Sequence, residues 1–381
     1  MEVCKNYAIF AAINGIILEN MIDNETGLTL SGLDPKRFES VVDGKQTHLW
    51  VLTNKQGAER CVTNYGGIVP SIMMPDRKGQ WANVVLGMED IGSVVNGPEP
   101  FLGATIGRYG NRIAGARFVL DGQEYKVTMS QAPNCLHGGK GFHARMWEGE
   151  QTDAQTLVLR YTSADGEEGF PGELKVEMTY RLTDDNEFRI DYKAATSKTT
   201  VCNLTNHAFF NLAGIQQVTP SVEDNILYIN ADRYCPIDEV SIPFGEKAPV
   251  EGTPFDFRKP TRVGDRIDAD CEQTKNGAGY DHSFCLNKSK EGELSLAAIC
   301  EDPGSGRTLT VYTTEPGIQL YTGNWLSGFT GQHGCTYPRR SAICFEAQHH
   351  PDSPNKPQFE TTTLRPGETY TQTTVYRFGI R

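Results

Sequence analysis

The sequence predicts an all-β protein built as one large antiparallel β-sandwich with few short helices. Segments that alternate between polar and apolar residues recur along the chain, turn signals join several of them, and helical periodicity is nearly absent beyond the first forty residues. No internal repeat, low-complexity tract or Ser/Gly linker divides the chain, so we expect a single domain over residues 31–381.

Residues 1–30 are expected to form an extension outside this domain. Their apolar run at 8–18 is about half as long as a membrane span and is broken by Asn14 and Gly15. No small-residue cleavage site follows, so we expect a cytoplasmic protein; export would require residues 1–20 to act as a signal segment. Asp34 followed by Pro35 is typical of a helix N-cap and first residue, which predicts a short helix within residues 31–40.

Most later segments are rich in β-branched and aromatic residues that alternate with polar ones, which predicts strands. These segments lie at 48–53, 60–66, 82–88, 156–163, 174–183, 187–196, 308–314 and 370–378. Asp121-Gly122 is a two-residue hairpin signal, and the polar run at 184–187 separates two alternating segments. Such close turns favour antiparallel pairing.

The stretch NLTNHAFFNL at 203–212 is predicted to be a further strand. With a period of two, His207 shares a face with Asn203, Thr205, Phe209 and Asn211. We expect this face to be wet and the opposite face to be core. The stretch is then either a ligand platform or an ordinary strand.

The charge balance excludes polyanionic partners. The chain of 381 residues carries 48 acidic and 36 basic residues, a net charge of −12, and its longest basic run is the pair Arg339-Arg340. Nucleic-acid binding draws on clustered Lys and Arg, so we expect no nucleic-acid partner and no membrane partner. Ten scattered cysteines without a Cys-x-x-Cys pair predict buried thiols in a reducing compartment and no metal site, although their even number would allow disulfides.

Motifs for a phosphate-binding loop, a nucleophile elbow or a zinc protease are absent from the sequence. What remains is a set of polar residues within apolar or glycine-rich stretches: Asn111, Arg112, His137, His207, Asp281, Gln319 and Glu346. Each histidine has a structural alternative as a buried or turn residue, as do His282, His349 and His350.

Glu346 stands in a run that otherwise looks buried. In a strand it would share a face with Cys344 and Gln348, opposite Ile343, Phe345 and Ala347. A buried carboxylate is costly unless it is paired, hydrogen-bonded or neutral with a raised pKa. Glu346 is therefore either the partner of a structural arginine or a catalytic base tuned towards neutral pH.

Together and in this order, the stretches resemble the aldose 1-epimerase (galactose mutarotase) family over about residues 45–378. The resemblance is carried by NYGG (64–67), GRYGNRIAGARFVLDGQEY (107–125), NCLHGG (134–139), NLTNHAFFNLAG (203–214), YDHSF (280–284), TTEPGIQLYTGN (313–324), EAQHHPDSPN (346–355) and ETTTLRPGETY (360–370). It implies a β-supersandwich and a monomeric enzyme that interconverts the anomers of free aldoses such as D-glucose and D-galactose. It implies no cofactor, although some relatives hold a structural Ca²⁺.

Carried over by residue, the resemblance implies Glu346 as general base, His207 as general acid and His137 as a helper at the ring oxygen. The residues expected to hold the sugar are Asn111, Arg112, Asp281, Gln319 and Phe209. The departures are small: Gly110 replaces a frequent Ala, Ala208-Phe209 a frequent Ser-Tyr, and His350 a common Phe. They concern sugar preference rather than the reaction.

Three other functions remain open from the sequence. A glycoside hydrolase would use Asp281 and Glu346 as paired carboxylates. A hexose 6-phosphate epimerase of the same fold would need cations for the phosphate, and Arg339-Arg340 is the only cluster. A non-catalytic carbohydrate-binding protein would have no need for both Glu346 and His207.

Overall fold

A computed structural model gives the fold and describes Asp23 and residues 26–381. Residues 1–22 and 24–25, which contain the possible signal segment, lie outside the described residues, and the domain boundary at residue 30 stays a prediction. The N-terminal part that is described is tied to the domain, because the carboxylate of Glu59 accepts hydrogen bonds from the backbone amides of Leu30 and Ser31 at 2.7 and 3.1 Å.

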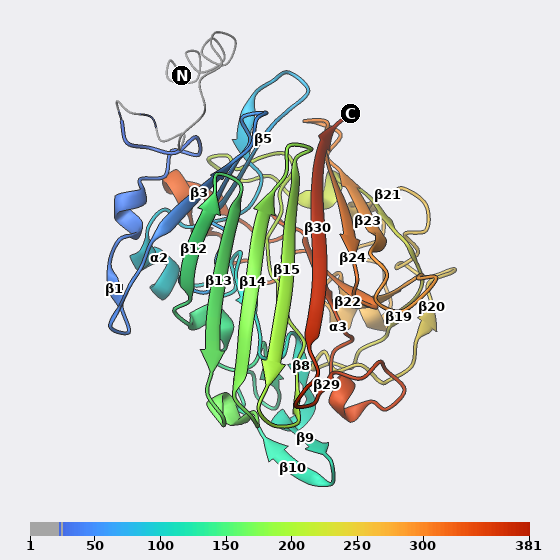
Figure 1. Cartoon of the computed structure of the whole chain (residues 1–381). Helices are drawn as coiled ribbons and strands as arrows, with labels where there is room; N and C mark the ends of the chain where they lie inside the picture. Colours follow the sequence, from blue (N-terminus) through green and yellow to red (C-terminus); the bar gives the residue numbers. More distant parts are fainter. Residues whose placement is uncertain (1–22, 24–25) are drawn as a thin grey trace.

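The largest layer is a nine-stranded antiparallel sheet, which runs across the front of the molecule in Figure 1. Its strands, in spatial order, are β12 (Glu148–Asp153), β13 (Thr156–Ser163), β14 (Leu174–Leu182), β15 (Glu187–Thr196), β30 (Tyr370–Ile380), β24 (Arg307–Thr313), β23 (Ser295–Glu301), β18 (Ile226–Ile229) and β21 (Thr261–Arg262). The predicted strands at 156–163, 174–183, 187–196, 308–314 and 370–378 all lie here, which confirms them.

Two smaller sheets accompany it. The five-stranded sheet has the order β20 (Ala248–Pro249), β19 (Ala231–Cys235), β22 (Asp281–Leu286), β25 (Gly317–Tyr321) and β28 (Cys344–Gln348). The four-stranded sheet has the order β3 (Leu49–Thr53), β4 (Glu59–Thr63), β5 (Ser71–Pro75) and β6 (Trp81–Asn83). Alternate side chains of all three sheets meet in one continuous hydrophobic core, which includes Val62, Met178, Ile318 and Phe378. The predicted antiparallel β-sandwich is confirmed.

Short two-stranded ribbons complete the β-structure. They are β1 (Val41–Val42) with β2 (Lys45–Gln46), β7 (Thr105–Ile106) with β17 (Thr205–Asn206), β8 (Arg112–Ile113) with β11 (Cys135–Leu136), β9 (Arg117–Leu120) with β10 (Gln123–Lys126), β16 (Thr200–Val201) with β29 (Thr363–Leu364), and β26 (Phe329–Thr330) with β27 (Thr336–Tyr337). The predicted Asp121-Gly122 hairpin joins β9 to β10, and both residues have the positive φ that its tight turn requires.

Helices are few and short in the described part of the chain. The α-helices are α2 (Ile91–Asn96) and α3 (Glu272–Asn276), and single 3₁₀ turns lie at Pro35–Phe38, Ala114–Ala116, Phe142–Ala144, Glu167–Gly169, Val222–Asp224, Val263–Asp265, Gln332–Gly334 and Ser353–Asn355. The predicted helix within 31–40 is the first of these turns, with Asp34 as its N-cap. None of these helices has the length and apolar character needed to cross a bilayer.

Two predicted strands are shorter than expected. The segment at 82–88 leaves the four-stranded sheet after Asn83, and its later backbone pairs instead with Phe209 and Phe210. The stretch at 203–212 contains only the two strand residues of β17, and all ten of its side chains are buried. The expectation of a wet face was wrong, because this stretch passes through the interior, where amides such as Asn211 satisfy buried carbonyls.

Candidate active site

The candidate site lies on one face of the five-stranded sheet. In β25 and β28, Gln319 is directly opposite Glu346, and Asp281 of β22 lies diagonally across from Gln319. Side chains alternate along each strand, so Phe284, Ile318 and Phe345 point to the opposite face and enter the core. The period-two pattern around Glu346 thus has the predicted arrangement, with an apolar core face behind a polar one.

His207 reaches this face from another part of the fold. It follows β17, and its backbone is fixed by hydrogen bonds to Ala104 and Gly103. Its Nε2 lies 3.5 Å from Oε1 of Glu346, and the exposed fractions of the two residues are 5% and 2%. The tertiary structure therefore joins the two residues expected to transfer protons.

His137 stands at right angles to His207, with ring centroids 5.3 Å apart. Its Nδ1 accepts a hydrogen bond of 3.1 Å from the backbone amide of Asn111, and its own amide donates to the carbonyl of Asn111. Because Nδ1 is an acceptor, the proton of the neutral ring is on Nε2. Burial and the nearby cationic groups hold the pKa of His137 well below its usual value, so the ring is a neutral donor.

The predicted sugar-holding residues surround this pair. Gln319 donates from Nε2 to Oδ1 of Asp281 at 2.6 Å. The Arg112 guanidinium bonds to Gln131 at 2.8 Å. Burial raises the pKa values of Glu346 and Asp281, and the charge of Arg112 partly opposes that rise. The backbone amide of Arg112 bonds to the side-chain oxygen of Asn111.

Aromatic rings hold His207 in place. Phe209 is buried and stacks on His207 with a centroid distance of 4.8 Å, and Phe101 is nearly parallel to His207 at 6.0 Å. Phe101 also contacts His137 at 4.6 Å. Trp325, by contrast, is 68% exposed.

Burial sets the protonation of the pair. It raises the pKa of Glu346 well above its usual range, and the charge of Asp281 acts in the same direction. It lowers the pKa of His207 to about 3. The pKa of His207 is this low because full burial disfavours the imidazolium form. One proton shared by the two groups therefore lies on Glu346 in the neutral pair.

Several polar atoms of the site have no hydrogen-bond partner although they are buried. They are Nδ1 of His207, Oε1 of Gln319, Oε2 of Glu346 and both amide atoms of Gln348. Unsatisfied buried polar atoms cost roughly 1–3 kcal/mol each, and most buried polar groups in proteins are paired. A cluster of them is the complement that a ligand with many hydroxyls requires.

Sequence reasoning missed two residues of this neighbourhood. Phe101 contacts both His137 and His207. Glu99 accepts a hydrogen bond from the backbone amide of Phe101, and burial raises its pKa to about 7. The charge of Glu99 also raises the pKa of Tyr321, which is in edge contact with His207. The one sequence signal was an acid between two prolines, followed by an aromatic, at 98–101, which resembles an ordinary loop.

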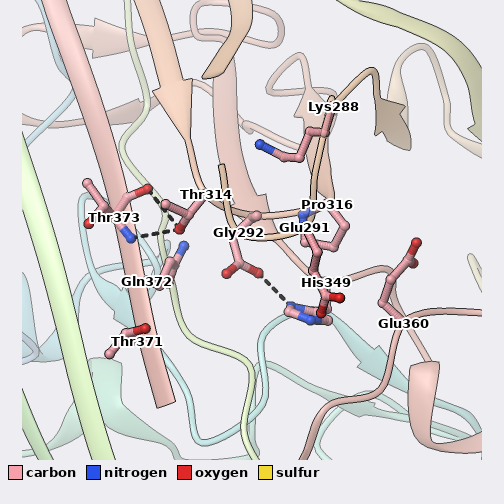
Figure 2. Close-up of a pocket in the computed structure, with 11 residues that line it drawn as sticks. Lys288, Glu291, Gly292, Thr314, Pro316, His349, Glu360, Thr371, Gln372 and Thr373 are labelled. Atoms are coloured by element: carbon pink, nitrogen blue, oxygen red, sulfur yellow. Dashed lines mark hydrogen bonds and ion pairs between the residues drawn. The ribbon is translucent and has the colours of Figure 1, made fainter. Parts of the chain in front are cut away.

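A separate hollow of about 200 Å³ lies outside this cluster. Figure 2 shows Lys288, His349 and Glu360 among the residues that line it, and it shares no residue with the site described above. Its buried Glu315 pairs with Nδ1 of His349 at 2.6 Å. His349 is thus a partner in a structural ion pair, and His282 faces the core against Phe255.

The structural Ca²⁺ held by some relatives would require a site rich in oxygen ligands. Calcium takes six to eight oxygen ligands. Among residues 23 and 26–381, groups of three or more His, Cys, Asp or Glu with ligand spacing are His137, His207 and Glu346, and Cys235, Cys285 and His350. Neither group offers an oxygen-rich set, so no step of the chemistry is assigned to calcium.

Comparisons with known proteins agree with the fold. The aldose 1-epimerase family model matches residues 48–377. Galactose mutarotase of Mus musculus is 44% identical over 84% of this chain and 90% of its own length, and aldose 1-epimerase of Escherichia coli is 37% identical over 88% and 96%.

Solved structures show the same relationship. The GalM/aldose epimerase homologue from C. elegans superposes with a TM-score of 0.80 at 28% identity, covering 88% of this chain and 99% of its own. Galactose 1-epimerase from Lactobacillus acidophilus gives a TM-score of 0.78 at 29% identity, covering 90% and 97%. Sequence and structure lead to the same conclusion: this chain belongs to the aldose 1-epimerase family.

Proposed function

We propose that the protein is a mutarotase that interconverts the α- and β-anomers of free hexoses, with D-galactose and D-glucose as substrates. The observation that carries the proposal is the contact of 3.5 Å between Nε2 of His207 and Oε1 of Glu346. Ring opening removes a proton from the hydroxyl on C1 and adds one to the ring oxygen. Since both oxygens are bonded to the same carbon, the base and the acid must be neighbours.

The single proton held by Glu346 and His207 suits this chemistry. The resting pair holds one proton on Glu346, and transfer of that proton to His207 gives a carboxylate base and an imidazolium acid without uptake from solvent. Glu346 then takes the C1 hydroxyl proton while His207 protonates the ring oxygen. C1–C2 rotation in the open aldehyde and the reversed transfers close the ring on its other face.

The surrounding groups hold the sugar. The proton transfers themselves need no cofactor. Asn111 and Arg112 offer donors, while Asp281 and the free Oε1 of Gln319 offer acceptors for hydroxyls. His137 offers its Nε2 proton to the oxygen that gains charge as the ring opens. Neutral imidazole is a suitable donor for this role, because it stabilises the oxygen without adding a buried charge.

Polarimetry with freshly dissolved α-D-galactose and α-D-glucose tests the proposal. The wild-type protein is expected to accelerate the approach to anomeric equilibrium for both sugars. A rate equal to that of buffer alone, with sugar binding retained in calorimetry, would favour a carbohydrate-binding protein instead. Release of reducing sugar from an aryl glycoside would favour a hydrolase.

Activity on hexose 6-phosphates has less support. Arg340 is bound by Glu223 at 2.5 Å and by Asp268 at 2.5 Å, so two carboxylates already neutralise its charge. Arg339 bonds to backbone carbonyls of Asn324 and Ala278. We expect glucose to be converted faster than glucose 6-phosphate, and the reverse order would indicate a phosphate site elsewhere.

A further inference from the structure

A second cluster of chemically reactive side chains lies on the same sheet face as the active site. Cys235 at the end of β19 is directly opposite Ser283 of β22, and Cys285 follows two residues later on the same face. His350, just beyond the end of β28, bonds through Nδ1 to Oγ of Ser283 at 2.9 Å. The two sulfurs and one nitrogen of His350 lie within 4.8 Å of one another.

The distances fit a tetrahedral metal site. The two sulfurs are free and 3.8 Å apart. Zinc–sulfur bonds are about 2.3 Å long, so two thiolates on a tetrahedral Zn²⁺ are about 3.8 Å apart. A disulfide would require about 2.05 Å, so the two sulfurs are at the spacing of ligands and not of a bond.

The imidazole of His350 is held ready for a ligand bond. The residue is completely buried, and its Nε2 has no hydrogen-bond partner. The ring passes over Gly317, where an added Cβ would lie 2.8–2.9 Å from ring atoms, so glycine is required for this approach. A metal-bound histidine usually has its other nitrogen fixed by a hydrogen bond, and the contact with Ser283 provides it.

An ion pair of Glu360 and Lys247 lies beside this cluster. The carboxylate of Glu360 lies 3.6 Å from Nε2 of His350 and is paired with Lys247 at 2.7 Å. Two thiolates and this carboxylate balance a divalent cation together with the ammonium of Lys247. Glu360 also lines the hollow shown in Figure 2.

We propose that Cys235, Cys285 and His350 bind one Zn²⁺ ion. The ion would tie β19 and β22 to the segment that follows β28. Of these strands, β22 carries Asp281 and β28 carries Glu346. Binding releases the thiol protons, so it strengthens as the pH rises.

Cobalt provides the direct test on the full-length protein. The protein is stripped with chelator, kept reduced with a phosphine so that no disulfide can form, and titrated with Co²⁺. We expect one Co²⁺ per chain with the thiolate-to-cobalt charge-transfer band and the intense visible bands of a tetrahedral site. Zn²⁺ is expected to displace the cobalt and to raise the melting temperature.

Variants show whether these residues hold the ion. Cys235→Ser and Cys285→Ser should each weaken the charge-transfer band and lower the affinity for Co²⁺ by roughly tenfold or more. This is at least the loss seen when a group that hydrogen-bonds to a metal ligand is removed. His350→Phe keeps a buried ring beside Phe359 and should weaken binding similarly. Among the nine cysteines that the structure describes, Cys271 is the other partly exposed one, and Cys271→Ser should leave the titration unchanged.

Three outcomes would overturn the proposal. One is a reduced wild-type protein that shows no charge-transfer band. Another is equal metal uptake by the Cys235→Ser/Cys285→Ser double variant. The third is a Cys235–Cys285 cross-link in unreduced protein whose reduced form takes up no metal, which would make the thiols a redox pair. Cobalt bound at His137, His207 and Glu346 would give no sulfur band, so these results are independent of the proposed mutarotase activity.

Discussion

Nε2 of His207 and Oε1 of Glu346 lie 3.5 Å apart, although the first residue follows β17 and the second is in the middle of β28. Each is almost completely buried, and burial shifts their pKa values in opposite directions, upwards for Glu346 and downwards for His207. When the pair holds one proton, that proton therefore lies on Glu346.

Removing either group should disable the same step. Glu346→Gln and His207→Asn are each expected to lower kcat by at least about 10²-fold, the usual scale of acid–base contributions. Since the two act as one unit, the double variant should be scarcely slower than the worse single variant. Polarimetry of α-D-galactose measures all three, and near-normal rates for either single variant would refute the assignments.

The pH profile should depend on the charges beside Glu346. The active form carries one proton on the pair. Activity therefore falls at low pH, when a second proton binds to the pair at His207, and at high pH, when Glu346 loses the single proton. Arg112 lowers the pKa of Glu346 and Asp281 raises it. Arg112→Gln should move the alkaline limb of kcat/KM to higher pH, and Asp281→Asn should move it to lower pH. Shifts of the same sign would contradict this account.

The tautomer of His137 gives another prediction. Its Nδ1 accepts the Asn111 amide, so ¹⁵N spectra of the wild type should show the proton on Nε2. Asparagine tolerates the local φ of 53°, so His137→Asn keeps the backbone but removes the Nε2 donor. We expect kcat/KM to fall about 10²-fold, the scale seen when an oxyanion donor is lost. Circular dichroism controls for folding. A proton found on Nδ1 would exclude the proposed role.

Arg307 is expected to hold the sandwich together. It is 3% exposed and donates to the carbonyls of Met74, Gln80, Leu212 and Ala213, with no carboxylate in that set. Arg307→Met would leave these buried acceptors unsatisfied and should lower the free energy of unfolding by about 3 kcal/mol or more.

The exposed Arg377 provides the matched control for this measurement. Its contact with Glu187 is 4.0 Å long, and its side chain is 53% exposed. Arg377→Met should change the free energy of unfolding by only about 0.5 kcal/mol or less. Urea denaturation compares the two variants, and equal losses would show that the carbonyl contacts of Arg307 contribute little.

Much of the fold could be predicted from local pattern. The strands of the nine-stranded sheet alternate because one face meets the core, and the Asp121-Gly122 turn has the required positive φ. The prediction failed for residues 203–212, where asparagines that resemble a wet face instead satisfy buried carbonyls. Local alternation cannot distinguish these cases, because burial on both faces depends on segments distant in the sequence.

The sequence by itself determined the strand-rich sandwich, the face of Glu346 and, through its ordered motifs, the family. The tertiary structure decided which polar residues meet: His207 with Glu346, His137 with Asn111, and Cys235 and Cys285 with His350. It also decided their protonation, since the low pKa of His207 follows from complete burial. The reason is that alternation records only the neighbours along one strand, whereas contact and desolvation arise from all the strands that pack around a side chain.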